Sequence, residues 1–292
     1  MLLEKGSPIL KKKIAFATCV QLGLSCIDEI LRIGGQLDLL VTLSDELAKN
    51  KSGRIYLDEV AKRENIDLLK INNINAKEVI DALIAHQIDW LFIIGWSQIA
   101  RKELLETPQK GCIGMHPTLL PEGRGRAAVP WAIIKGLEHT GVTMFKLDEG
   151  VDTGDIIGQG LIEINDRTTA TELYKKVEKM HVQLISKYWD DIVNEKIVFT
   201  KQDESKASVW PGRKPEDGEL NKDMTMDEAD KLIRAVAHPY PGAFYRQGPN
   251  VIRIWSAEMD KNKGDIRLKD GFIKLLNCEV EVQHGEVDQT IN

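Results

Sequence analysis

The residues best suited to chemistry lie in two stretches near the middle of the chain. Residues 111–126 read GCIGMHPTLLPEGRGR, in which a short apolar run ends at His116 and a loop containing two prolines and two glycines follows. Residues 148–155 read DEGVDTGD and place four carboxylates within eight residues. A histidine beside a carboxylate is held in one tautomer or kept protonated, as acid–base catalysis requires. Because functional residues concentrate in loops on rigid scaffolds, these stretches are the first candidate site.

Taken alone, each stretch also has an ordinary structural explanation. A histidine after a strand is commonly a hydrogen-bonded core residue, and an acidic turn is commonly solvated or caps a neighbouring element. Calcium is a further alternative for residues 148–155, but the EF-hand spacing is missing and the two glycines favour a tight, shaped loop.

Strands and helices alternate before the first stretch. Short apolar runs predict strands at residues 13–18, 37–43, 67–71 and 90–95, and helical spacing falls at 26–33, 77–86 and 99–105. This order predicts an α/β fold: a Rossmann-like, mostly parallel sheet with helices on both faces. Ligands of such sheets bind beyond the carboxyl ends of the strands. The glycine-rich dinucleotide fingerprint is absent after the first strand, so no tightly bound nicotinamide or flavin is expected.

The chain changes character after residue 200. Residues 168–196 predict one long helix, with Thr169 and Glu172 at capping-box spacing. A polar stretch rich in proline and glycine follows, then a helix near 226–237 and short strands, including a hairpin that turns at Asp270-Gly271. We therefore expect a catalytic domain over 1–200, a linker over 201–212, and a small strand-rich, OB-like domain over 213–292. The small domain offers a surface for a homodimer.

Composition excludes several classes of protein. Of the 292 residues, 42% are hydrophobic and 29% charged, with a net charge of −6, so neither wholesale disorder nor a general attraction for nucleic acid is expected. No apolar run reaches the ~18 residues of a membrane span, and the first residues lack the apolar centre of a signal peptide. A cytoplasmic location follows as an expectation. The four cysteines have no CxxC spacing and are expected to be reduced packing residues rather than metal ligands.

Two motifs together resemble the formyltransferase family that uses 10-formyltetrahydrofolate. They are GCIGMHPTLLPEGRGRAAVPW and TGVTMFKLDEGVDTGDII, and HPYPGAF at residues 238–244 resembles the C-terminal domain of members that act on sugars and tRNA. The resemblance implies a site made of an asparagine, a histidine two residues later and an aspartate 36 residues after the histidine. His116 and Asp152 match, since 116 + 36 = 152, whereas Gly114 replaces the asparagine. The hydrolase domain of formyltetrahydrofolate dehydrogenase, another member, similarly lacks it.

The resemblance also implies a mechanism. A primary amine attacks the formyl carbon, and His116 either donates a hydrogen bond to the resulting oxyanion or accepts the amine's proton, while Asp152 orients its ring. A missing oxyanion donor costs ~3–4 kcal/mol. With Gly114 in place, we expect a backbone N–H or a water in the room beside the glycine to supply that donor.

Folate recognition is likewise implied by the resemblance rather than by spacing. 10-Formyltetrahydrofolate is expected as a co-substrate, without any metal. For Trp96 an ordinary role as a core anchor is equally compatible with the sequence. The expected folate-binding residues are Ile94, Gly95, Trp96, Met115, Leu120, Pro121, Asp148, Glu149 and Gly150.

Three classes of amine compete as the acceptor. Residues 204–292 contain 13 Lys and Arg against 16 Asp and Glu, a net charge of −3. This charge argues against tRNA as the substrate, and no nucleic-acid partner is expected. Members that act on glycinamide ribonucleotide lack the small domain. An amino sugar on a nucleoside diphosphate fits better, because Arg124, Arg126 and Arg213 are suited to hold a diphosphate, although they also suit a solvated loop. The alternatives are a methionyl-tRNA formyltransferase, or a folate hydrolase or folate-binding protein as suggested by Gly114.

Overall fold

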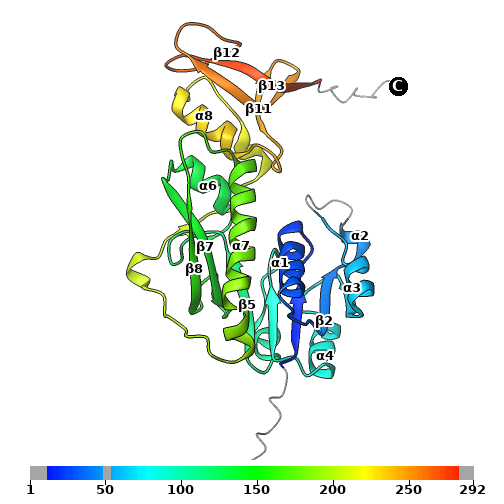
Figure 1. Ribbon diagram of the computed structural model, residues 1–292. Helices are drawn as coiled ribbons and strands as arrows, with labels where there is room; N and C mark the ends of the chain where they lie inside the picture. Colours follow the sequence, from blue (N-terminus) through cyan, green and yellow to red (C-terminus); the bar gives the residue numbers. More distant parts are fainter. Residues whose placement is uncertain (1–11, 49–53, 283–292) are drawn as a thin grey trace, which may run out of the picture. The chain divides into compact units, whose positions relative to one another are not determined.

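A computed structural model describes residues 12–48 and 54–282 (Figure 1). The chain forms two compact units, each assembled from separate stretches. The first contains the chain up to His116, Val142–Gly160 and Glu178–Lys206; the second contains Pro117–Gly141, Leu161–Val177 and the chain from Ala207 onward.

A seven-stranded sheet forms the core of the first unit. Its strands lie in the order β3-β2-β1-β4-β5-β7-β8, of which the first five are parallel and β7 is antiparallel to β5. The mostly parallel, Rossmann-like sheet predicted from the sequence is therefore confirmed. The bounds are β1 Ile14–Ala17, β2 Leu39–Leu43, β3 Asp67–Ile71, β4 Trp90–Ile93, β5 Gly111–His116, β7 His139–Lys146 and β8 Ile156–Glu163.

Helices cover both faces of this sheet (Figure 1). On one face the rings of Phe16 and Phe92 stack with centroids 5.7 Å apart, and Trp189 of α7 lies 6.0 Å from Phe92. On the other face, Leu83 of α4 and Leu104 of α5 join the buried apolar cluster. The bounds are α1 Gln21–Arg32, α2 Asp45–Ala48, α3 Asp58–Glu64, α4 Lys77–Ala85, α5 Lys102–Glu106 and α7 Ala170–Val193.

Several helix bounds differ from those predicted. The first helix begins at Gln21 rather than near residue 26, because its apolar spacing marks only the buried half of an amphipathic element. The helix expected from residue 99 begins at Lys102, and Ile99 is exposed outside it. The capping box of α7 forms as predicted, with the backbone N–H of Thr169 donating to Glu172 Oε2 at 2.9 Å.

The second unit contains a small antiparallel sheet, as the sequence predicted. Strands β10-β11-β13-β12 lie in that order, β12 and β13 form the hairpin predicted at Asp270-Gly271, and the apolar side of α8 packs on the sheet through Leu232 and Ile233. A separate parallel pair joins β6 to β9. The bounds are β6 Arg124–Gly125, α6 Ala128–Ile134, β9 Val209–Trp210, α8 Met226–Ala235, β10 Ala243–Gln247, β11 Asn250–Asp260, β12 Ile266–Arg267 and β13 Phe272–Val282.

Candidate active site

His116 and Asp152 lie side by side in the first unit. His116 ends β5 and is 7% exposed, and Asp152 lies in the turn between β7 and β8. The His116 Nδ1 atom is 3.4 Å from Asp152 Oδ2. A carboxylate facing Nδ1 favours the tautomer with the proton on that nitrogen, which leaves Nε2 as the acceptor nitrogen of the ring. The structure thus brings together the two side chains that the sequence singled out.

The turn that carries Asp152 has a defined shape. The backbone N–H of Lys146 donates to the carbonyl of Asp155 at 2.9 Å, which closes the base of the turn. The Thr153 hydroxyl donates to Asp148 Oδ1 at 2.6 Å inside it. Asp152 itself has φ +56°, in the left-handed region that non-glycine residues rarely adopt. Its backbone is thus held in a conformation that the surrounding turn imposes.

Gly114 precedes His116 by two residues, so the two share one face of β5. A Cβ atom on Gly114 would lie 2.6 Å from Leu147 Cδ2, because the backbone N–H of Leu147 donates to the Cys112 carbonyl at 2.8 Å and holds that residue over the strand. The room predicted here for a water molecule is therefore not present, and that expectation is wrong. An oxyanion donor has to come from another group.

A cavity of about 570 Å³ lies between α5, the loop that leads into β5, and residues 146–150. Three of the predicted folate-binding residues, Asp148, Glu149 and Gly150, line it together with Leu147. Lys102 of α5 lies 3.6 Å from the Glu149 carboxylate at its rim. The volume falls in the range of small-molecule pockets, roughly 300–1,000 Å³.

The other predicted folate residues of the first unit differ in accessibility. Ile94 is completely buried, whereas Gly95 is exposed with φ +69°. Trp96 is half-buried, donates to Gln98 Oε1 at 3.3 Å and packs against the core. The Met115 side chain belongs to the face of β5 opposite to Gly114, since side chains alternate along a strand. Gly95, Trp96 and Met115 therefore keep some exposed surface, whereas Ile94 does not.

The remaining predicted residues belong to the second unit. Leu120 is 3% exposed, and the Pro121 carbonyl accepts a hydrogen bond from the Ser208 N–H at 3.2 Å. Arg124 is 5% exposed, and its backbone N–H donates to the Ser208 carbonyl at 2.9 Å. The buried Arg124 therefore belongs to the β6·β9 pair rather than to a solvated loop, the ordinary alternative for this arginine.

The β6·β9 pair also brings Arg126 beside the segment that contains Arg213. The Arg126 N–H donates to the Trp210 carbonyl at 3.2 Å. A Cβ atom on Gly212 would lie 3.7 Å from Arg126 Cδ, so the Arg126 side chain runs beside the residue before Arg213. Two of the three predicted substrate arginines are therefore neighbours.

These arginines belong to a group that we call the cation–indole cluster: Arg126, Trp131, Lys135, Trp210 and Arg213. The Arg213 guanidinium lies 5.0 Å from the centroid of the Trp131 ring. Lys135 Nζ lies 5.9 Å from the Trp131 ring and 5.8 Å from the Trp210 ring. Burial lowers the pKa of Arg213 from its usual value. A guanidinium nevertheless stays charged in proteins at neutral pH. The cluster can offer a planar guanidinium, a lysine and an indole face to one anion.

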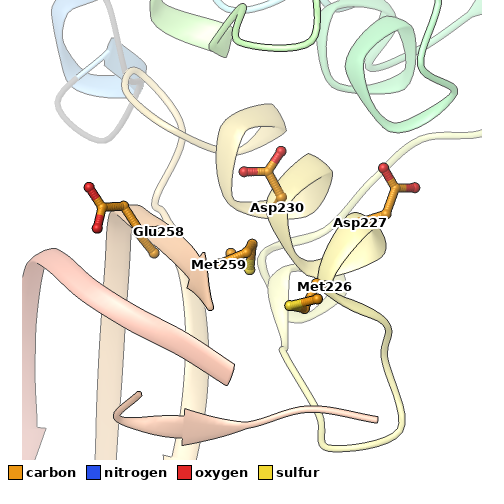
Figure 2. Close-up of a pocket in the computed structure, with 6 residues that line it drawn as sticks. Met226, Asp227, Asp230, Glu258 and Met259 are labelled. Carbon is orange, nitrogen blue, oxygen red and sulfur yellow. The ribbon is translucent and has the colours of Figure 1, made fainter. Parts of the chain in front are cut away.

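An acidic cavity of about 550 Å³ lies elsewhere in the second unit, between α8 and β11 (Figure 2). Asp227 and Asp230 come from α8, and Glu258 comes from β11. Each of these carboxylates has a lysine or arginine nitrogen within 3.2 Å. The carboxylates are therefore neutralised locally, and this cavity does not attract a polyanion.

Comparison with known proteins identifies the family. The profile of a family described as formyl transferase matches residues 37–188, and that of a formyl transferase C-terminal domain matches residues 213–287. A methionyl-tRNA formyltransferase of Bacillus cytotoxicus is 31% identical over 234 residues, which cover 78% of this chain and 74% of that protein. The chain belongs to the formyl transferase family. It is a formyltransferase and draws on formyltetrahydrofolate as its formyl donor.

Solved structures agree on the fold of this formyltransferase. A 4-N formyltransferase from Francisella tularensis is 27% identical with a TM-score of 0.66, covering 81% of this chain and 93% of that one. An N-formyltransferase from Helicobacter canadensis, solved with folinic acid and dTDP-3-aminofucose, is 20% identical with a TM-score of 0.68 and covers 92% and 100%. At that identity, the second likeness concerns the fold alone.

Sequence reasoning missed several residues around the sites of this formyltransferase. Leu147 carried no signal, because only the fold places it against Gly114. Trp131 and Lys135 lie four residues apart around α6, and this spacing beside a predicted arginine is the signal that would have found them. Across residues 12–48 and 54–282, no group of three or more His, Cys, Asp or Glu is arranged to hold a metal ion. No helix within those same ranges is long and apolar enough to cross a membrane.

Proposed function

We propose that this formyltransferase transfers the formyl group of 10-formyltetrahydrofolate to the amino group of a nucleotide-linked amino sugar. The cation–indole cluster carries the proposal. Lys135 lies over the Trp131 and Trp210 rings and Arg213 over the Trp131 ring, while the Arg126 side chain runs beside the residue before Arg213. A diphosphate needs such closely spaced cations. Arg124 is proposed to support the loop from its buried position, while Arg126 and Arg213 contact the ligand.

The chemical step is proposed to use His116 twice. The amine nitrogen bonds to the formyl carbon, and His116 Nε2 takes the proton that the amine loses. The resulting imidazolium donates a hydrogen bond to the oxyanion and then returns the proton to N10 of the folate as the carbon–N10 bond breaks. Asp152, 3.4 Å from Nδ1, stabilises the positive charge on the ring meanwhile. One residue thus replaces the side-chain donor that is absent at Gly114.

The folate is proposed to use the cavity beside residues 146–150. Asp148 Oδ1 accepts a hydrogen bond from the Gly150 N–H at 3.1 Å, so this carboxylate shapes the turn rather than facing a ligand. Backbone groups of the turn and the Leu147 side chain then present polar and apolar surface to a pterin ring. Gly95 and Trp96 are proposed to border the same ligand.

Two other functions have an observation in their favour. The Bacillus cytotoxicus relative is a methionyl-tRNA formyltransferase, which favours tRNA as the acceptor. Against tRNA, the lysine and arginine beside the carboxylates of α8 are already paired with them. These cations therefore offer no unpaired positive charge to a phosphodiester backbone. The second function is a hydrolase. Gly114 lacks the side-chain oxyanion donor of the family asparagine, and Leu147 fills the space beside it, which favours a protein that does not transfer the formyl group rapidly to an amine.

One experiment separates these functions. The protein is incubated with 10-formyltetrahydrofolate alone, with a panel of nucleotide-linked amino sugars, or with methionyl-tRNA, and released tetrahydrofolate and formylated product are measured. We expect turnover with an amino-sugar nucleotide and a rate at least about a hundredfold lower with water alone. Turnover only with methionyl-tRNA, or equal rates with and without amine, would overturn the proposed acceptor.

A further inference from the structure

Gln202, in the segment that follows α7, contacts the backbone of the turn that carries Asp152. Its Nε2 atom donates to the carbonyl of Asp152 at 2.8 Å and to the carbonyl of Gly154 at 2.8 Å. A primary amide has two N–H groups on one nitrogen, so each carbonyl can receive its own hydrogen. All three residues belong to the first unit.

The segment around Gln202 is fixed to the same turn by its backbone. Thr200 and Ile156 exchange two backbone hydrogen bonds, with N–O distances of 2.8 and 2.9 Å. This bridge places residue 202 opposite the carbonyls of residues 152 and 154. The side chain therefore acts from an anchored backbone, so only its own rotamers have to be ordered when its amide engages.

Other contacts hold different parts of the turn. The Lys146–Asp155 hydrogen bond closes its base, and Asp148 organises its first half. Gln202 acts on the carbonyl of Asp152 itself, the residue whose left-handed φ of +56° aims its carboxylate. A change of a few tens of degrees at this residue would move Oδ2 away from His116.

We propose that Gln202 is a positioning residue that holds the Asp152 carboxylate against His116. The proposal rests on the proposed roles of Asp152 and His116. Glutamate at position 202 would have nearly the same shape but would set carboxylate oxygens against the two carbonyl oxygens. Leucine would leave both carbonyls without the amide. Either change releases the turn, whereas His116 and Asp152 remain in the chain.

The test compares Gln202→Glu and Gln202→Leu with Lys201→Gln, an exposed matched control in the same segment. We expect both Gln202 variants to lower kcat about 10- to 100-fold, since misplacing a catalytic group by ~1 Å costs up to about a hundredfold. KM for 10-formyltetrahydrofolate should change less than about threefold, and Lys201→Gln should behave as the wild type. In an Asp152→Asn background, Gln202→Leu should not lower kcat further, because the carboxylate that Gln202 positions is already absent.

A readout in the free protein complements the kinetics. Histidine ¹⁵N NMR of the full chain follows the ring nitrogens of His116, whose resonances Asp152→Asn should displace because the carboxylate beside Nδ1 is lost, and each Gln202 variant should displace them in the same direction. If Asp152→Asn lowers kcat and the Gln202 variants do not, the positioning role is refuted and the site stands. If neither residue affects kcat, the site itself is wrong. An additive loss in the double variant would also overturn the proposal.

Discussion

Replacement of Asp152 by asparagine removes one negative charge and preserves most of the turn. Asparagine has the shape of aspartate and is among the residues that adopt a left-handed backbone, here φ +56°. The Asp152 carbonyl that accepts the Gln202 amide is also retained. Alanine would instead add left-handed strain of about 1–2 kcal/mol, so asparagine is the cleaner variant.

The size of the effect follows from the distance between the two groups. Two unit charges 3.4 Å apart interact by about 5 kcal/mol at an effective dielectric constant of about 20. Because the Asp152 side chain is 17% exposed, water screens part of this, and we take about 2.5–5 kcal/mol as the stabilisation of protonated His116 that is lost. At ~1.4 kcal/mol for each factor of ten, kcat should fall about 10²- to 10⁴-fold.

The assay measures tetrahydrofolate release at saturating donor with the amine that supports wild-type turnover. Asp155→Asn is the matched control, because Asp155 contributes its backbone carbonyl to the same turn. Thermal unfolding and folate affinity of Asp152→Asn should stay near wild-type values. A kcat within threefold of wild type, in a variant that folds and binds folate normally, would refute the assignment of Asp152 as the carboxylate that supports catalysis.

Three other perturbations test separate parts of the structure. Gly114→Asn should lower the free energy of unfolding by about 1–3 kcal/mol through overlap with Leu147, and adding Leu147→Ala should recover part of it in denaturant titrations. Arg213→Gln should raise KM for the amine acceptor about 10- to 100-fold by removing charge-assisted hydrogen bonds, while an unchanged acceptor KM would argue against the cation–indole cluster. Both ring nitrogens of His86 face acceptors, Asp67 at 2.9 Å and a backbone carbonyl, which raises the pKa of His86, the Asp67 hydrogen bond contributing most. The His86–Asp67 pair should contribute less than about 1 kcal/mol to the free energy of unfolding. This contribution should be complete below the unfolded pKa of ~6.5 and should be lost as the pH rises through the higher pKa of His86 in the folded state. A His86→Gln variant whose unfolding keeps the same pH dependence would contradict this.

Regular elements with a simple periodicity were predictable from the sequence. The apolar strands of the parallel sheet and the α7 capping box at Thr169 and Glu172 follow from local patterns, and the structure confirms them. Helix starts were less predictable. The first turn of α1 begins after Val20, a residue without a side-chain cap, so no local signal marked its beginning.

The candidate site divides in the same way. The spacing between His116 and Asp152 is a property of the sequence, and their 3.4 Å approach requires only the strand and the turn. Leu147 and Gln202 act through contacts that depend on tertiary structure: one crosses to β5 and the other comes from fifty residues beyond Asp152. Neither residue type has a spacing that marks such a role, and only coordinates reveal it.

Gly114 stands where the family pattern has an asparagine, and this difference alters the packing beside the site as well as one hydrogen bond. Leu147 occupies the space beside the glycine, so an apolar side chain lies on the strand face that ends in His116. We infer that this leucine excludes water from the space beside Gly114, while the partly exposed Asp152 carboxylate keeps contact with water on its own side of the pair. Under the proposed mechanism, the site then depends more heavily on the His116 imidazolium as an oxyanion donor than a site containing an amide does. In a Leu147→Asn background, Asp152→Asn should therefore lower kcat less than it does in the wild type. Water and the new amide would then share in stabilising the charge on His116, which the Asp152 carboxylate otherwise stabilises alone.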